Sequence, residues 1–260
     1  MNNVIISLVP GLGMMLAAFG AVFYWRRISG ILFRWFWVGA ALWAVAVALK
    51  FGCDMLTSGP VLGFMKDRFS YPLFVVCGGG YLGIQSSVFE MGLTLLAVLI
   101  WRQLGNDAGK AIGIGVGAGA LEALALGILS LVAMLSALAG GDASEETRKA
   151  IDALAETTPL FWLVAPVERV IAILCHAASR ALILLGMVHQ RYLMIVWGFL
   201  LFTFLDGVAG AMHVSLKLGE ISMWWVELAL APFALISLPI LRWCYATWGD
   251  MGEDNPNLFR

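Results

Sequence analysis

The sequence predicts an all-α fold, a polytopic membrane helix bundle of about seven transmembrane helices. Of its 260 residues, 61% are hydrophobic and only 13% are charged, and the mean hydropathy is +0.89; soluble domains are far more polar. Seven separate apolar runs are long enough to cross a bilayer, which takes about 20 residues. The net charge of -1 does not indicate a nucleic-acid partner. We therefore expect one transmembrane domain over residues 1–260, whose first partner is the lipid bilayer of the cell membrane, of the bacterial inner (plasma) membrane type.

The predicted spans are residues 4–25, 35–56, 81–101, 111–139, 160–188, 192–215 and 221–247. The first is expected to be retained as a helix, because it lacks a basic leading region and a small-residue cleavage site. The stretch "SYPLFVVCGGGYLGIQ" is less regular, since Pro72 and Gly78–Gly80 interrupt an apolar run. It predicts a re-entrant or broken segment leading into the third span, which is tolerated only where protein or a water-filled cavity satisfies the backbone.

The basic residues predict the orientation. Lys and Arg near the ends of the spans divide eight to five between the two faces: Arg26, Arg27, Arg34, Arg102, Lys110, Arg191, Arg242 and Arg260 against Lys66, Arg68, Arg148, Lys149 and Lys217. The richer face is cytoplasmic by the positive-inside rule, so the N-terminus is outside and the C-terminus inside. The longest connection, a loop at 140–158 between the fourth and fifth spans, is then on the outer side.

Acidic side chains inside the predicted spans are the first functional signal. They are Glu90, Glu122, Glu168, Asp206 and Glu227. Each costs about 2.5–3.5 kcal/mol at the bilayer centre on insertion scales, so an intramembrane acid indicates function by default. Counting residues from the span ends places the first four near the midplane or in the outer half. Glu227 lies nearer the outer interface and is expected to be a solvated or helix-packing acid.

The fifth span, "APVERVIAILCHAASRALILLG", carries the most charge. Arg169, His176 and Arg180 fall on one stripe of this helix, since positions seven and eleven apart nearly eclipse, and Glu168 lies on the neighbouring stripe. Asp206 gives the sixth span a polar edge that can face it. Two interpretations follow: a structural network of ion pairs, or a polar cavity with a function. The concentration of polar groups in one region favours the cavity.

The fourth span contains "IGIGVGAGALEALALG", which is rich in glycine. It is not a nucleotide-binding loop, because it lies within an apolar span and no strand precedes it. Gly113/Gly117 and Gly115/Gly119 are small-xxx-small pairs, which let another helix approach closely. Glu122 follows them directly and requires a partner. The four cysteines have no C-x-x-C spacing and indicate no zinc or redox site.

Three motifs in order carry a resemblance to a known family: "GIGVGAGALEA" (113–123), "VERVIAILCHAASRALI" (167–183) and "FLDGVAG" (204–210). Over residues 30–247 the chain resembles the YhfC family of intramembrane peptidases, relatives of the type II CAAX-processing proteases and of the seven-helix scaffold subunit of gamma-secretase. The resemblance implies a membrane core in which glutamates and a histidine activate a water for peptide hydrolysis. On that basis the catalytic candidates are Glu122 and Glu168 as the acid/base group, with Glu90, His176 and Asp206 around them.

The same resemblance implies a membrane protein or lipidated peptide as substrate, or a partner helix, and it leaves the cofactor and the metal open. One histidine among scattered acids is a weak metal signal. The chain also departs from the family pattern. "VFEMGL" has one acid where the family usually has two glutamates followed by an arginine, and Ala118 and Phe202 stand where histidines are common.

These departures support an alternative, a degenerate non-proteolytic member that acts as a scaffold or binds a partner helix. A third function, a transporter, ranks below these two, because many transporter folds carry inverted repeats and the sequence shows none.

Overall fold

The chain folds into a bundle of long helices, as a computed structural model shows for residues 2–139, 145, 149, 153, 156–215 and 222–249. The helices are α1 (Asn2–Ser29), α2 (Phe33–Arg68), α3 (Tyr71–Ile100), α4 (Ala108–Ala139), α6 (Val164–Val188), α7 (Tyr192–Val214) and α8 (Trp224–Trp248), with short 3-10 turns η1 (Arg102–Gly105) and η2 (Phe161–Leu163). In this part of the chain, seven helices are long and apolar enough to cross a membrane. The predicted all-α fold class and number of spans are confirmed.

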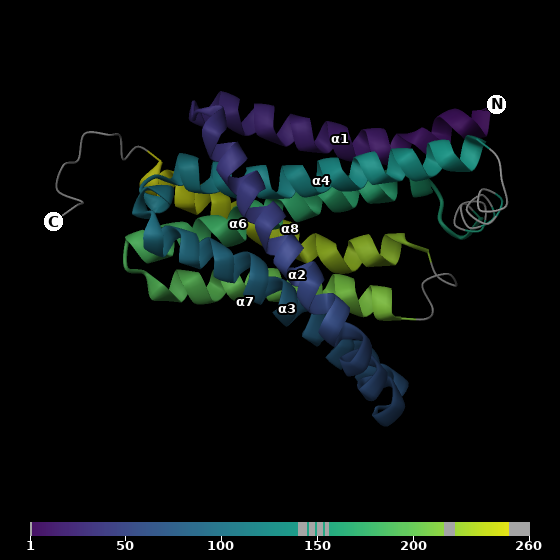
Figure 1. Ribbon diagram of the computed structural model, residues 1–260. Helices are drawn as coiled ribbons and strands as arrows, with labels where there is room; N and C mark the ends of the chain where they lie inside the picture. The colour runs from purple at the N-terminus through teal and green to yellow at the C-terminus, as the bar shows by residue number, and fades with distance from the viewer. Residues whose placement is uncertain are drawn as a thin grey trace.

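The two ends of the bundle are clearly separated. The start of α1 and the end of α8 lie at opposite ends, as an odd number of spans requires (Figure 1). Which end faces the outside stays a prediction. Most of the predicted outer loop at 140–158 lies outside the described residues.

The helix α6 forms the centre of the bundle. Every residue from Cys175 to Gly186 is buried, and α1, α3, α4, α7 and α8 all pack against α6 (Figure 1). Arg169, His176 and Arg180 lie on this helix and are all buried, so its polar stripe faces protein rather than lipid. Burial among helices is the only placement within a bilayer that lets these groups find partners.

Glycines in α4 set the distance to its neighbours. A Cβ atom on Gly115 would lie 2.7 Å from the carbonyl oxygen of His176, and one on Gly117 would lie 2.1 Å from that of Phe36. Gly115 therefore lets α6 pack closely against α4, and Gly117 lets α2 do so. The predicted role of these small-xxx-small pairs in close helix packing is confirmed.

The predicted broken segment before the third span is wrong, because α3 is one continuous helix from Tyr71. Pro72 lies in its first turn, where a missing N–H group costs nothing. Two of the glycines that follow serve close packing: a Cβ on Gly79 would lie 2.5 Å from the carbonyl oxygen of Gly207, and one on Gly83 would lie 2.3 Å from that of Thr203. Their function is the close contact of α3 with α7.

The helix α2 is also longer than predicted, since it continues from 56 to Arg68 through Pro60. A proline within a transmembrane helix is tolerated when its surroundings satisfy the freed carbonyl. The extension pairs with α3, where the Thr57 and Tyr81 hydroxyl groups lie 2.9 Å apart. The tip of the α2–α3 hairpin projects beyond the other helices (Figure 1).

We predict that Gly83→Ala lowers the free energy of unfolding by about 1–3 kcal/mol, because the added methyl group overlaps the backbone of α7. Gly80→Ala is the matched control, since a Cβ there meets nothing within 4 Å. Its effect should stay between zero and a gain of about 1 kcal/mol from helix propensity. Thermal or denaturant unfolding in detergent micelles measures both, and equal effects would contradict the proposed packing.

Candidate functional site

The polar stripe of α6 is almost fully enclosed. Arg180 is 0% exposed, His176 is 2% exposed and Arg169 is 8% exposed. The free-energy cost of burying an unpaired charge at this depth is prohibitive, so each of these groups must have a partner within the bundle. The partners come from α3, α4 and α6 itself.

His176 is held at both ring nitrogens. Its Nε2 lies 2.7 Å from Oε2 of Glu122 on α4, and Nη1 of Arg180 donates to its Nδ1 at 2.5 Å. A guanidinium group can only donate hydrogen bonds, so Nδ1 must accept. The imidazole is therefore the neutral tautomer with its proton on Nε2, and this N–H donates to Glu122.

Arg180 connects this histidine to α3. Its Nη2 donates to Oε2 of Glu90 at 2.9 Å, and both side chains are buried. Glu90 is 3.8 Å from Nδ1 of His176, too far for a hydrogen bond. The ring of Phe202 closes the other side, with its centroid 4.9 Å from that of His176. Glu90 therefore acts on His176 through Arg180.

Arg169 neutralises two acids at the other end of the stripe. Its Nη1 lies 2.5 Å from Oε1 of Glu122, and its Nη2 pairs with Glu168. Glu122 thus has one oxygen on Arg169 and the other on His176. This carboxylate has a fixed orientation, which is the requirement for an acid or base that acts in a defined direction.

A small cavity lies beside these groups, with a volume of about 40 Å³. Glu122, Glu168 and Asp206 contribute carboxylates to its wall, together with Arg169 and His176. Apolar residues complete the enclosure: Ile171, Ala172, Leu205, Ala209 and Leu230. The space is sufficient for water, since one water needs about 10–15 Å³ measured this way, and the polar wall offers it partners. The cavity does not hold a peptide in this state.

The polar region extends to α2 through residues that the sequence analysis missed. Lys50 of α2 donates a hydrogen bond to the hydroxyl group of Ser86 on α3. Asp206 interacts with Ser86 and lies within electrostatic range of Lys50 and Glu90. The available signal was a lysine in the middle of the predicted span 35–56, which has the same cost as an intramembrane acid.

The structure brings four of the five predicted site residues to one cavity: Glu122, Glu168, His176 and Asp206. Glu90 is the exception, because it does not line the cavity and instead forms an ion pair with Arg180. Glu227 is buried, at 4% exposure, which excludes the solvated alternative for that acid. Among the described residues, neither of its carboxylate oxygens has a hydrogen-bond partner.

The fold and this site define a multi-pass membrane protein whose helices enclose a charged, water-sized cavity. The sequence model of the family described as YhfC intramembrane metalloprotease matches residues 13–230. The match covers most of the chain, and the chain belongs to this family, as the motifs predicted. No curated protein and no solved structure is significantly similar to it.

The family description implies a metal, and the donor atoms of this chain do not fit one. Protein-bound zinc takes at least three protein ligands, yet the described residues contain no group of three His, Cys, Asp or Glu side chains placed to hold an ion. His176 has no free lone pair, because Nδ1 accepts from Arg180 and Nε2 carries the proton donated to Glu122. The positive charge here comes from arginine.

We predict that Glu90→Gln and Arg180→Met each lower the free energy of unfolding by about 3–5 kcal/mol, because each leaves its partner buried as an uncompensated charge. The double variant should cost less than the sum, by about 0.5–3 kcal/mol, since it removes both charges. Denaturant unfolding in detergent micelles gives the free energy of unfolding of the wild type and the three variants, which completes the double-mutant cycle. Strictly additive losses would show that the pair is not coupled.

We also predict that the protein, purified without a strong chelator, retains zinc far below one ion per chain, and that chelation leaves its melting temperature unchanged. Elemental analysis by mass spectrometry gives the first value, and a thermal melt with and without chelator gives the second. Stoichiometric zinc that disappears in His176→Ala would contradict this account of the donor atoms.

Proposed function

We propose that the protein is an intramembrane peptidase in which Glu122 takes the proton of a water held in the cavity. The supporting observation is the position of this carboxylate, which is oriented by His176 and Arg169 and faces a water-sized space enclosed by helices. We place the protein as a single transmembrane domain in a bacterial plasma membrane, with its N-terminus outside. The proposed substrate is a peptide bond of a membrane protein or lipidated peptide.

The chemistry follows from the groups on the wall. As the water oxygen attacks the scissile carbonyl carbon, its proton passes to Glu122. The negative charge that develops on the carbonyl oxygen lies in the field of the Arg169 guanidinium, whose stabilising effect is large in a cavity without bulk water. The proton then passes to the amide nitrogen as the C–N bond breaks. His176 fixes Glu122 through its Nε2–H group, and Glu168 and Asp206 are the remaining acids within the cavity.

A non-proteolytic scaffold is the second candidate, and the pairing in the site favours it. Both arginines are engaged with carboxylates, and the cavity is too small for a peptide in this state. Ala118 and Phe202, at positions where the family resemblance implies histidines, are fully buried. In this function the network fixes the packing of the helices, and a partner helix binds to the outside of the bundle.

The experiment compares new protein N-termini in membranes of cells that express the wild type, Glu122→Gln or Glu168→Gln at matched folded levels. Glutamine keeps the shape of the side chain and one acceptor oxygen, but its amide group cannot take a proton. We expect Glu122→Gln to abolish a set of termini seen with the wild type, and Glu168→Gln to reduce the same set. Glu145→Gln is the control, because this acid is exposed and outside the site.

The two candidates give different results. Termini that vanish with Glu122→Gln and persist with Glu145→Gln support the peptidase and identify its substrates. Identical termini from folded wild-type and Glu122→Gln proteins would reject the peptidase and leave the scaffold.

A further inference from the structure

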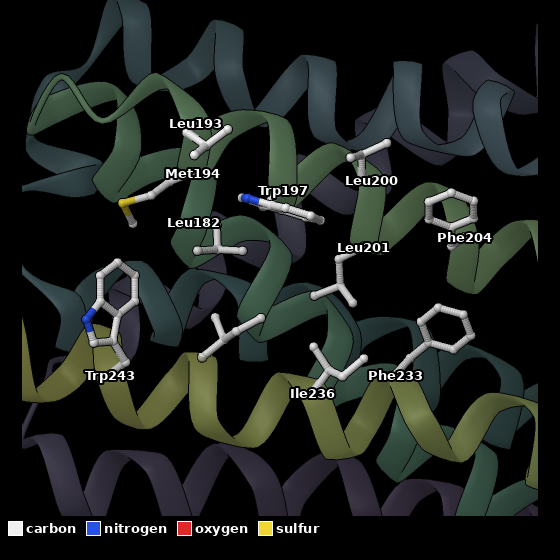
Figure 2. A pocket seen from close by; sticks show the side chains of 11 residues that line it. Leu182, Leu193, Met194, Trp197, Leu200, Leu201, Phe204, Phe233, Ile236 and Trp243 are labelled. Atoms are coloured by element: carbon white, nitrogen blue, oxygen red, sulfur yellow. The ribbon is translucent and has the colours of Figure 1, made fainter.

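A second, larger hollow lies away from the charged site, between α7 and α8. Its volume is about 530 Å³, and its lining is almost wholly apolar. Six side chains from Leu193 to Phe204 on α7 form one wall, four from Phe233 to Trp243 on α8 form the other, and Leu182 of α6 lies between them (Figure 2). We call this the α7–α8 groove. No residue that lines it belongs to the cavity at Glu122.

The length of the α7–α8 groove matches one leaflet of a bilayer. From Leu193 to Phe204 a helix rises by about 16 Å, and half of the hydrocarbon core measures about 15 Å. Leu193 is the second residue of α7, so the groove begins close to one membrane surface. It ends at Phe204, one residue before Leu205 of the charged cavity. An acyl chain from that leaflet spans the same depth.

The groove is too small to enclose a transmembrane helix. A helix with side chains is at least about 10 Å across and 30 Å long in a bilayer, and so displaces more than about 2,000 Å³. The groove offers about 530 Å³, less than a third of that. An unbranched hydrocarbon chain fits a narrow apolar channel without requiring polar partners.

The open end of the groove is positively charged. Arg191, which is exposed, directly precedes α7. The first turn of α7 contains no acidic residue, so no carboxylate there opposes a bound phosphate group. Leu193 and Met194 of the same turn line the groove. Helix N-termini with a neighbouring arginine attract phosphate groups.

We propose that the α7–α8 groove binds one acyl chain of an anionic phospholipid from the leaflet at the α6–α7 turn, with the phosphate group at Arg191 and the start of α7. The site is independent of the peptidase proposal, because it shares no residue with the cavity. Bound lipid holds α7 and α8 in their positions on α6.

Native mass spectrometry tests the site with phosphatidylglycerol and phosphatidylcholine titrated onto the detergent-purified chain. We expect one phosphatidylglycerol per chain to remain at collision energies that remove all other lipid. Ile236→Trp fills the groove and should weaken this binding by about tenfold or more, equivalent to about 1.4 kcal/mol. Leu193→Trp, at the open end, provides a second variant if the first fails to fold.

Leu235→Trp is the matched control, because Leu235 is adjacent on α8 and exposed at 67% against 51% for Ile236, but does not line the groove. Arg191→Gln should reduce the preference for phosphatidylglycerol over phosphatidylcholine severalfold, whereas Arg27→Gln, an exposed arginine at the end of α1, should not. Equal retention in Ile236→Trp and Leu235→Trp, an unchanged preference in Arg191→Gln, or a co-purified polypeptide in place of the lipid would overturn the proposal.

Discussion

The burial of two arginines on one helix is the constraint on which the rest of the structure depends. Arg169 and Arg180 cannot face lipid at mid-span, so α6 must lie at the centre of the bundle, and carboxylates must reach it from α3 and α4. Two of the surrounding helices are fixed by the carboxylate that each brings to α6: Glu90 from α3 and Glu122 from α4. The cavity lies beside this network, and Glu122, Arg169 and His176 form part of its wall.

The pairs also require a short distance between helix axes. Glu122 reaches His176 only because Gly115 lets α4 approach the backbone of α6, and Gly117 does the same for α2 on the opposite face. On the far side, Gly79 and Gly83 bring α3 against α7, which carries Ser86 towards Asp206. Small residues and buried charges thus form one system, in which the glycines set the geometry that the ion pairs need.

The sequence predicted the spans well and the site partly, for physical reasons. Length and hydropathy are sufficient for seven helices, and the cost of charge in lipid identifies Glu122, Glu168, His176 and Asp206. Pro72 and Gly79 are residue types that often end helices, and here they misled the prediction. Whether a glycine ends a helix or lets another helix pack closely depends on its neighbour in space, which for Gly79 is Gly207, 128 positions away. The partner of each buried acid was also unpredictable from the sequence, since Glu90 could face either His176 or Arg180 on the same stripe.

The neutral state of His176 limits what the site can do as it stands. With Nδ1 on Arg180 and Nε2–H on Glu122, the imidazole holds other groups in place and has no free position of its own. Leu205 of α7 and Leu230 of α8 form part of the apolar wall of the cavity, whose volume must grow before a peptide can enter. Pro232 lies two residues beyond Leu230 and leaves a gap in the hydrogen bonds of α8, which allows the helix to bend there.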